Sequence, residues 1–326
     1  MQRQVPEAPP ERGLPPLRWS NSAHRLPRHG DQVPGDREGA GGGVRDRRLP
    51  GAEGRGPREV AGGNRHKGKA EEAYLSVKAI IFFVGPAGTG KSTLTGSLLS
   101  YMEDTNRNVA VVNLDPGADE LPYEADLDIR EEITLEKMMK EYGLGPNGAQ
   151  IAAADAVALH AGEIRKTLEG MNPDYVLVDT PGQMELFAFR VSGRVIVDTV
   201  GGKESFILFL ADPNLLRTPL DFVSTLFLAS SVHFRFPYPM LMVASKADLL
   251  DEEAEERVLR WSSDPEALHA DLLGERPSMA KELGIGMLRT LGELLLPGQM
   301  VPVSSVSGRG LDRILEHVDQ VMGILD

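Results

Sequence analysis

The chain has 326 residues, of which 41% are hydrophobic and 25% are charged, and it carries a formal net charge of −13 and no cysteine. This length suffices for one or two domains, and the absence of cysteine excludes disulfides, thiolate metal sites and cysteine nucleophiles and fits a cytoplasmic protein. The negative charge argues against direct nucleic-acid binding, and the apolar runs are far shorter than the roughly 20 residues of a membrane-spanning helix.

Residues 1–76 differ from the rest of the chain in composition. They contain 12 Arg and 2 Lys against 10 Asp and Glu, so they carry +4 and residues 77–326 carry −17. Their 13 Gly and 9 Pro and their lack of apolar periodicity predict a disordered basic extension. We interpret it as sequence upstream of a mis-assigned start, with Val77 as the first native residue; a basic tail that binds RNA or an acidic partner is the alternative.

From residue 78 onward, strand-like and helix-like segments alternate, which predicts an α/β fold with a mostly parallel sheet and helices on both faces. Continuous apolar runs, which suit strands buried on both faces, lie at 79–84, 109–114, 175–179, 206–211, 240–244 and 300–303. Helical patterns occupy 91–103, 131–142, 152–168, 185–199, 215–231 and 311–325. The acidic stretch 251–297 is interpreted as a helical insertion between the last two strands, within one domain that spans 77–326.

The segment between the first strand and the first helix matches G-x-x-x-x-G-K-[ST], the signature of a phosphate-binding loop, or P-loop. It reads Gly85-Pro86-Ala87-Gly88-Thr89-Gly90-Lys91-Ser92 and is followed by Thr93. Its glycines let backbone amides face the phosphates, and the start of the helix adds its positive dipole. We expect Lys91 to reach the outer phosphates and the Ser92 hydroxyl to ligate Mg²⁺; a plain glycine-rich turn is the weaker alternative.

Two carboxylates follow predicted strands, at the edge where an open α/β sheet places its ligands. Asp179 opens the run Asp-Thr-Pro-Gly-Gln and is predicted to hold Mg²⁺. The next residues add Gly182, whose amide is expected to reach the terminal phosphate, and Gln183, which is expected to orient water. Asp115 opens Asp-Pro-Gly and is predicted to approach Mg²⁺ or the attacking water. A role in turns alone is the alternative for both carboxylates.

Two motifs near the C-terminus are candidates for recognising the base. Ser245-Lys246-Ala247-Asp248 and Ser304-Ser305-Val306 follow the last two predicted strands. The Asp248 carboxylate can accept hydrogen bonds from both the ring N–H and the amino group of guanine, a pair that adenine does not present, and the stem of Lys246 can lie over the base. The order of the two motifs therefore indicates a guanine nucleotide.

With these motifs aligned, the chain resembles the GPN-loop GTPases, a family of dimeric P-loop enzymes. The deciding residues are Gly145-Pro146-Asn147, which lie between the Asp115 and Asp179 segments as in the family pattern. Asn113-Leu114-Asp115-Pro116-Gly117 and Asp179-Thr180-Pro181-Gly182-Gln183-Met184-Glu185 also match. The resemblance covers about residues 78–326. A lone Gly-Pro-Asn is a common turn, so the surrounding motifs carry the assignment.

The resemblance implies a Mg²⁺-dependent GTPase that works as a homodimeric nucleotide switch. Gly145, Pro146 and Asn147 would enter the site of the partner subunit, near the terminal phosphate and the attacking water. Asp115, Asp179 and Gln183 would help to hold Mg²⁺ and orient that water, so that no arginine finger is needed. Family members in eukaryotes are linked to RNA polymerase assembly, which by analogy suggests a client of that kind.

Two positions depart from related patterns. The guanine motif usually begins with Asn, whereas this chain has Ser245, which makes fewer supporting hydrogen bonds and weakens the expected preference for guanine. Related dimeric ATPases carry an additional Lys at the second P-loop position, where this chain has Pro86.

Two other functions fit the P-loop. One is a kinase that transfers the terminal phosphoryl group to a nucleotide or polynucleotide hydroxyl. The acidic insertion is a poor place for its phosphate-rich acceptor. The other is a non-catalytic assembly factor that nucleotide binding controls.

Overall fold

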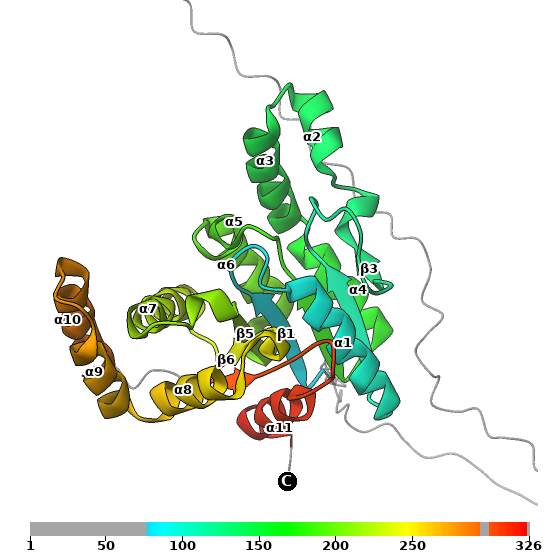
Figure 1. Ribbon diagram of the computed structural model, residues 1–326. Helices are drawn as coiled ribbons and strands as arrows, with labels where there is room; N and C mark the ends of the chain where they lie inside the picture. Colours follow the sequence, from blue (N-terminus) through cyan, green and yellow to red (C-terminus); the bar gives the residue numbers. More distant parts are fainter. Residues whose placement is uncertain (1–76, 294–299, 325–326) are drawn as a thin grey trace, which may run out of the picture. The chain divides into compact units, whose positions relative to one another are not determined.

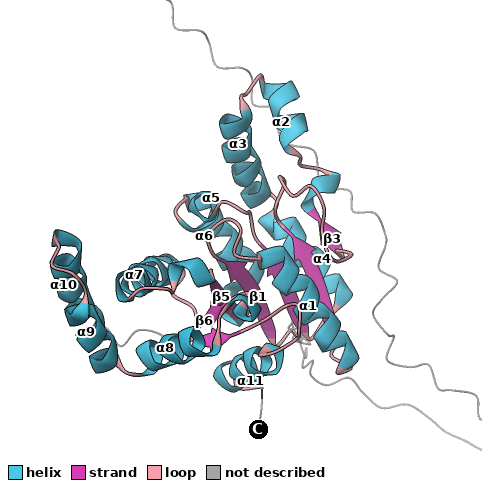
Figure 2. Ribbon diagram, in the orientation of Figure 1, coloured by secondary structure: helices cyan, strands magenta, loops and turns pink. Residues whose placement is uncertain are grey.

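Seven parallel strands form a single sheet in the order β3-β2-β4-β1-β5-β6-β7. The computed structural model, which describes residues 77–293 and 300–324, shows β1 near the middle of this sheet (Figure 2). The strands are β1 (Ala79–Val84), β2 (Val109–Asn113), β3 (Leu127–Asp128), β4 (Tyr175–Asp179), β5 (Ser205–Ala211), β6 (Met240–Ala244) and β7 (Val301–Pro302).

Helices cover both faces of the sheet (Figure 1). They are α1 (Lys91–Asp104), α2 (Leu135–Tyr142), α3 (Pro146–Leu159), α4 (Ala161–Met171), α5 (Met184–Ala188), α6 (Val191–Ile196), α7 (Pro219–Arg235), α8 (Glu252–Ser263), α9 (Pro265–Gly274), α10 (Met279–Glu293) and α11 (Leu311–Val321). None of the helices in the described part of the chain is both long and apolar enough to span a membrane.

The alternation of side chains along β1 divides the core into two layers. Ile80, Phe82 and Val84 pack into the layer that contains α3, α4 and α7. Ala79, Ile81 and Phe83 point to the opposite layer, with α1 and α11. Because both faces of the strand are buried, its sequence is a continuous apolar run and does not alternate with polar residues.

The predicted α/β fold is confirmed, and three strands coincide with their predicted ranges, namely 79–84, 175–179 and 240–244. The two-residue strand β3 was not predicted, since it is too short to show a period. The helix predicted over 152–168 is wrong in its bounds: it begins at Pro146, because proline suits the first position of a helix. A new helix begins after His160, whose φ and ψ are −96° and 4°.

The helix predicted over 185–199 is also interrupted. Helix α5 ends at Ala188, and Arg190, which is extended, is the N-cap of α6. The 251–297 insertion is helical in its described residues and consists of α8, α9 and α10, while its last residues lie outside the described part of the chain. It packs on the sheet layer through Trp261, whose ring lies 5.5 Å from that of Phe222 in α7.

Candidate nucleotide site

The P-loop joins the C-terminal end of β1 to the start of α1, as the sequence predicts. Gly88 and Gly90 have φ of 78° and 85°, in the left-handed region that favours glycine. A side chain at Gly85 would meet the Leu210 carbonyl oxygen at 2.6 Å. No side chain caps the N-terminus of α1. The amides of its first turn are therefore available to an anion.

Lys91 links the P-loop to the segment that follows β4. Its ammonium group donates hydrogen bonds to the carbonyl oxygens of Gly85 at 2.8 Å, Pro86 at 3.1 Å and Gly182 at 3.2 Å. Burial lowers the pKa of Lys91, although the charges of Asp179 and Asp115 act in the opposite direction. These hydrogen bonds hold the ammonium group of Lys91 between the P-loop and the Gly182 segment, where it can meet a phosphate.

Asp179 is the last residue of β4, and its side chain is completely buried. Its Oδ2 accepts a hydrogen bond of 2.8 Å from the Tyr123 hydroxyl, whereas Oδ1 has no partner among the described groups. Burial raises the pKa of Asp179 to about 6, against the opposing effect of the Ser92 and Tyr123 hydroxyls. A buried carboxylate with one unpaired oxygen beside a serine hydroxyl fits a cation ligand.

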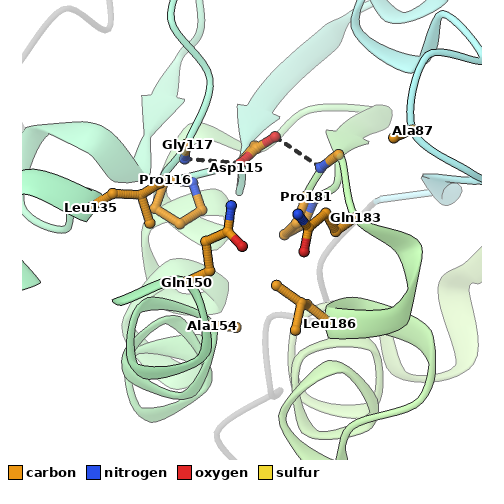
Figure 3. A pocket seen from close by; sticks show the side chains of 11 residues that line it. Ala87, Asp115, Pro116, Gly117, Leu135, Gln150, Ala154, Pro181, Gln183 and Leu186 are labelled. Carbon is orange, nitrogen blue, oxygen red and sulfur yellow. Dashed lines mark hydrogen bonds between the residues drawn. The ribbon is translucent and has the colours of Figure 1, made fainter. Parts of the chain in front are cut away.

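Asp115 bridges the segments that follow β2 and β4 (Figure 3). Its Oδ1 accepts a hydrogen bond from the Gly117 amide and its Oδ2 accepts one from the Gly182 amide, both at 2.9 Å. Asn113 fixes the backbone of Asp115, because its Oδ1 accepts a 3.0 Å hydrogen bond from the Asp115 amide. With both oxygens engaged, Asp115 fits the orientation of water better than direct metal ligation.

Contacts from Asp128, the last residue of β3, and from Arg130 hold the segment that follows β2. The Asp128 carboxylate accepts hydrogen bonds from Asn113 at 2.9 Å and from Arg130, whose guanidinium also donates to the carbonyl oxygens of Ala118 and Asp119. Burial raises the pKa of Asp128, but the hydrogen bonds from Arg130 and Asn113 outweigh it and leave the pKa below its ordinary value. The carboxylate therefore remains ionised near neutral pH.

These segments enclose a pocket of about 180 Å³ beside the P-loop. It is lined by Ala87, Asp115, Pro116, Gly117, Leu135, Gln150, Ala154, Pro181, Gly182, Gln183 and Leu186. The structure thus brings together the predicted residues Asp115, Gly182 and Gln183. Helix α3 adds Gln150, which the sequence analysis did not select.

The predicted base-recognition residues lie on the side of the P-loop where Lys246 contacts Gly88, away from the pocket. The Lys246 ammonium group donates to the Gly88 carbonyl oxygen at 2.5 Å and to Asp212 at 2.9 Å. Asp248 accepts a 2.6 Å hydrogen bond from the Ser304 hydroxyl. The buried Ser245 hydroxyl donates to the Ala211 carbonyl oxygen. Ser305 is half-buried and Val306 is exposed.

Gly145, Pro146 and Asn147 do not line the pocket of their own chain. They are exposed at the start of α3, at the tip of the hairpin that α2 and α3 form (Figure 1). Gly143, which has φ of 63°, ends α2 and allows the reversal between the two helices. The structure therefore separates the tripeptide from the predicted residues that surround the P-loop.

Besides Gln150, four residues of the site escaped the sequence analysis as functional candidates: Tyr123, Asp128, Arg130 and Asp212. The first three belong to the segment after β2, which has no periodic pattern. Their roles become visible only through contacts with other parts of the chain, such as that of Tyr123 with Asp179. Asp212 directly follows β5. Its place after a buried strand was the one signal available for it.

Comparison with known proteins shows which family the chain is similar to. A protein-family model described as "conserved hypothetical ATP binding protein" matches residues 83–324. A GPN-loop GTPase of Pyrococcus abyssi is 38% identical over 236 residues, which cover 72% of this chain and 93% of that protein. GPN-loop GTPase 1 of Schizosaccharomyces pombe is 30% identical over 249 residues, 73% of this chain and 67% of the yeast protein. The crystal structure of an apo GTPase from Pyrococcus abyssi superposes with a TM-score of 0.68, at 36% identity and over 74% of this chain and 97% of that one.

Proposed function

The chain belongs to the GPN-loop GTPases, and we propose that it binds GTP with Mg²⁺ and hydrolyses it to GDP and phosphate as a homodimer. One observation carries the proposal. The pocket beside Ala87 brings Asp115, Gly182 and Gln183 together next to the uncapped amides of the P-loop. A terminal phosphate on those amides would have the pocket on its outer side, lined by groups that can orient the nucleophile.

Nucleotide binding would exchange two sets of hydrogen bonds. Lys91 would give up carbonyl oxygens of the P-loop for phosphate oxygens, which are charged and therefore stronger acceptors. The Gly182 amide would leave the Asp115 carboxylate for the terminal phosphate. The freed Asp115 oxygen would then accept a hydrogen bond from the attacking water. The oxygen of that water forms a bond to the γ-phosphorus as the bond to the β–γ bridging oxygen breaks.

The residues near the P-loop fit a magnesium ion. The Ser92 hydroxyl and the unpaired Oδ1 of Asp179 would hold it. No group of three acidic or histidine side chains within the described ranges forms a metal site by itself. This suits Mg²⁺, which usually takes one or two protein ligands together with phosphates and water. When bound, the ion neutralises negative charge on the β- and γ-phosphates.

Several observations support a homodimer in which each subunit completes the site of the other. Asn147 is exposed, and the same helix carries Ile151 and Leu159, both exposed apolar residues. Helix α6, which α3 contacts, adds Val191, which is 81% exposed. An apolar surface next to the exposed tripeptide fits the same surface on a second copy, because a two-fold interface is self-complementary.

The test is phosphate release by the full chain with GTP and Mg²⁺ as the only substrates. We expect multiple turnovers with GTP, loss of activity on removal of Mg²⁺ by a chelator, and much slower release from ATP. Oligomeric state is recorded on the same samples with and without nucleotide. A strict requirement for an acceptor nucleotide would contradict hydrolysis and favour a kinase. Tight GTP binding without any turnover would favour an assembly factor.

The replacement Asp248→Ala tests the proposed choice of base. It removes the carboxylate expected to pair with the guanine edge, so the affinity for GDP should fall about 100-fold while the weak affinity for ADP stays the same. Titration with fluorescent GDP and ADP analogues measures both affinities. Glu252→Ala, which changes an exposed carboxylate at the start of α8, is the control. Equal losses for the two nucleotides would show that Asp248 supports the fold of the site and does not read the base.

A further inference from the structure

Gln150 lies in the second turn of α3 and lines the pocket that Asp115, Gly182 and Gln183 form. Figure 3 shows its carboxamide below Asp115, on the side of the pocket opposite Gln183. The two glutamines come from different elements, since Gln183 precedes α5 and Gln150 belongs to the helix that begins with Pro146 and Asn147. They reach the same space from opposite walls.

Gln150 is a polar residue on a side of α3 that otherwise packs inward. The same side of α3 continues with Ala154 and Val157, which are 6% and 1% exposed, so this side packs inward. Gln150 is half-buried, and within residues 77–293 and 300–324 its carboxamide has no hydrogen-bonding partner. Its oxygen and nitrogen are not among the buried side-chain atoms that lack a partner in the described part of the chain, so both are accessible from the pocket. A water molecule or ligand in the pocket would supply the missing hydrogen bonds.

We propose that Gln150 is a catalytic residue that holds the attacking water in the site of its own subunit. The inference rests on the proposed GTP hydrolysis and adds a residue to it. The carboxamide oxygen accepts one hydrogen bond from the water, so that the water's oxygen faces the γ-phosphorus. The amide exchanges no proton, and the proton released when water attacks passes to the phosphate product or to solvent. The pocket has space for several waters, so a residue that fixes one of them favours the reactive arrangement.

Helix α3 would then serve two sites. Asn147 is exposed and available to a partner, whereas Gln150, one turn later, faces the pocket of its own chain. The contribution of Gln150 is therefore made within one subunit and does not depend on contact by the Gly-Pro-Asn tripeptide of the partner.

The test compares Gln150→Ala and Gln150→Met with Gln320→Ala, an exposed glutamine on α11. In single-turnover assays with saturating GTP, both Gln150 variants should hydrolyse about 10- to 100-fold more slowly, with unchanged GDP affinity and melting temperature. Complex formation with GDP and aluminium fluoride, which imitates the phosphoryl group under attack by water, should weaken in parallel. Gln320→Ala should match the wild type in every measurement.

Each outcome supports or overturns the inference. Full hydrolysis by both Gln150 variants, with an active wild type, would overturn it and leave the proposed function intact. Full hydrolysis by Gln150→Met alone would also overturn it, since methionine keeps the length of the side chain but not its hydrogen bonds. An inactive wild type would instead contradict the proposed function itself.

Discussion

Asp179→Asn is expected to abolish hydrolysis and at the same time to stabilise the nucleotide-free protein. The wild-type carboxylate is buried, has an unpaired oxygen and has a pKa of about 6 against an ordinary value of 3.8. A shift of this size corresponds to about 3 kcal/mol of free energy of unfolding lost at neutral pH. Asparagine is neutral and keeps an acceptor for Tyr123. It removes the carboxylate that Mg²⁺ needs, so the rate should fall on the order of 100- to 1000-fold.

The pH dependence separates this effect from ordinary packing. A carboxyl group whose pKa is raised by folding favours the folded state most at low pH, and that contribution is lost as the pH rises through 6. The variant should therefore match the wild type near pH 4 and exceed its free energy of unfolding by about 3 kcal/mol at pH 8. Urea unfolding at both pH values, without nucleotide or metal, measures the difference.

Asp174→Asn is the matched control for this experiment. This carboxylate is partly exposed and lies 3.4 Å from the Lys78 ammonium group at the opposite end of the sheet. An exposed ion pair contributes little, so the change should stay below about 1 kcal/mol at either pH and leave hydrolysis intact. An Asp179→Asn protein that is less stable than the wild type at pH 8 would show that the carboxylate is compensated in the empty site.

Mixed dimers are expected to recover activity that neither parent has, if Asn147 acts in the partner site. Gln183 lines the pocket of its own chain, whereas Asn147 does not. Homodimers of Asn147→Ala and of Gln183→Ala should each lose most of their activity. A dimer with one copy of each keeps one intact site, in the Asn147→Ala subunit, because the partner supplies a native Asn147. It should therefore turn over at about half the wild-type rate per dimer.

Two affinity tags, one on each variant, allow the mixed dimer to be purified after co-expression. The control pairs Gln183→Ala with Asp179→Asn, two changes that both affect the site of their own subunit. Each site in that dimer has one defect, so no activity should return. Failure of the Asn147 and Gln183 pair to recover activity would contradict the partner-site role of the tripeptide. So would a fully active Asn147→Ala homodimer.

Much of this arrangement follows from local sequence. The runs that form β1, β4 and β6 are apolar throughout because these strands are buried on both faces. Asp179 was recognised at the end of a strand and Lys91 at the start of the helix that follows the P-loop, each in a motif whose spacing has a chemical reason. The exposed Asn147 was identified through the family resemblance, and its role in a partner site stays a prediction.

The remaining contacts depend on the tertiary fold. Tyr123 meets Asp179 across 56 residues of chain, and no local pattern marks the tyrosine for that contact. Arg130 looks like an ordinary surface residue until β3 pairs with β2 and brings Asp128 beside Asn113. Gln150 belongs to a helix rich in alanine, and only the packing of α3 shows that its side chain faces the pocket.

The position of Asn147 and Gln150 on one helix has a consequence for the timing of hydrolysis. A helix moves as a rigid rod over a single turn, so α3 cannot adjust to one nucleotide without shifting the group it offers to the other. If Asn147 acts across the dimer, a shift of α3 caused by nucleotide in one site also moves Asn147 in the site of the partner. The occupancy of one site then affects the geometry of the other. The dimer would then hydrolyse GTP efficiently only when both sites are filled, and the rate of hydrolysis should rise cooperatively with GTP concentration.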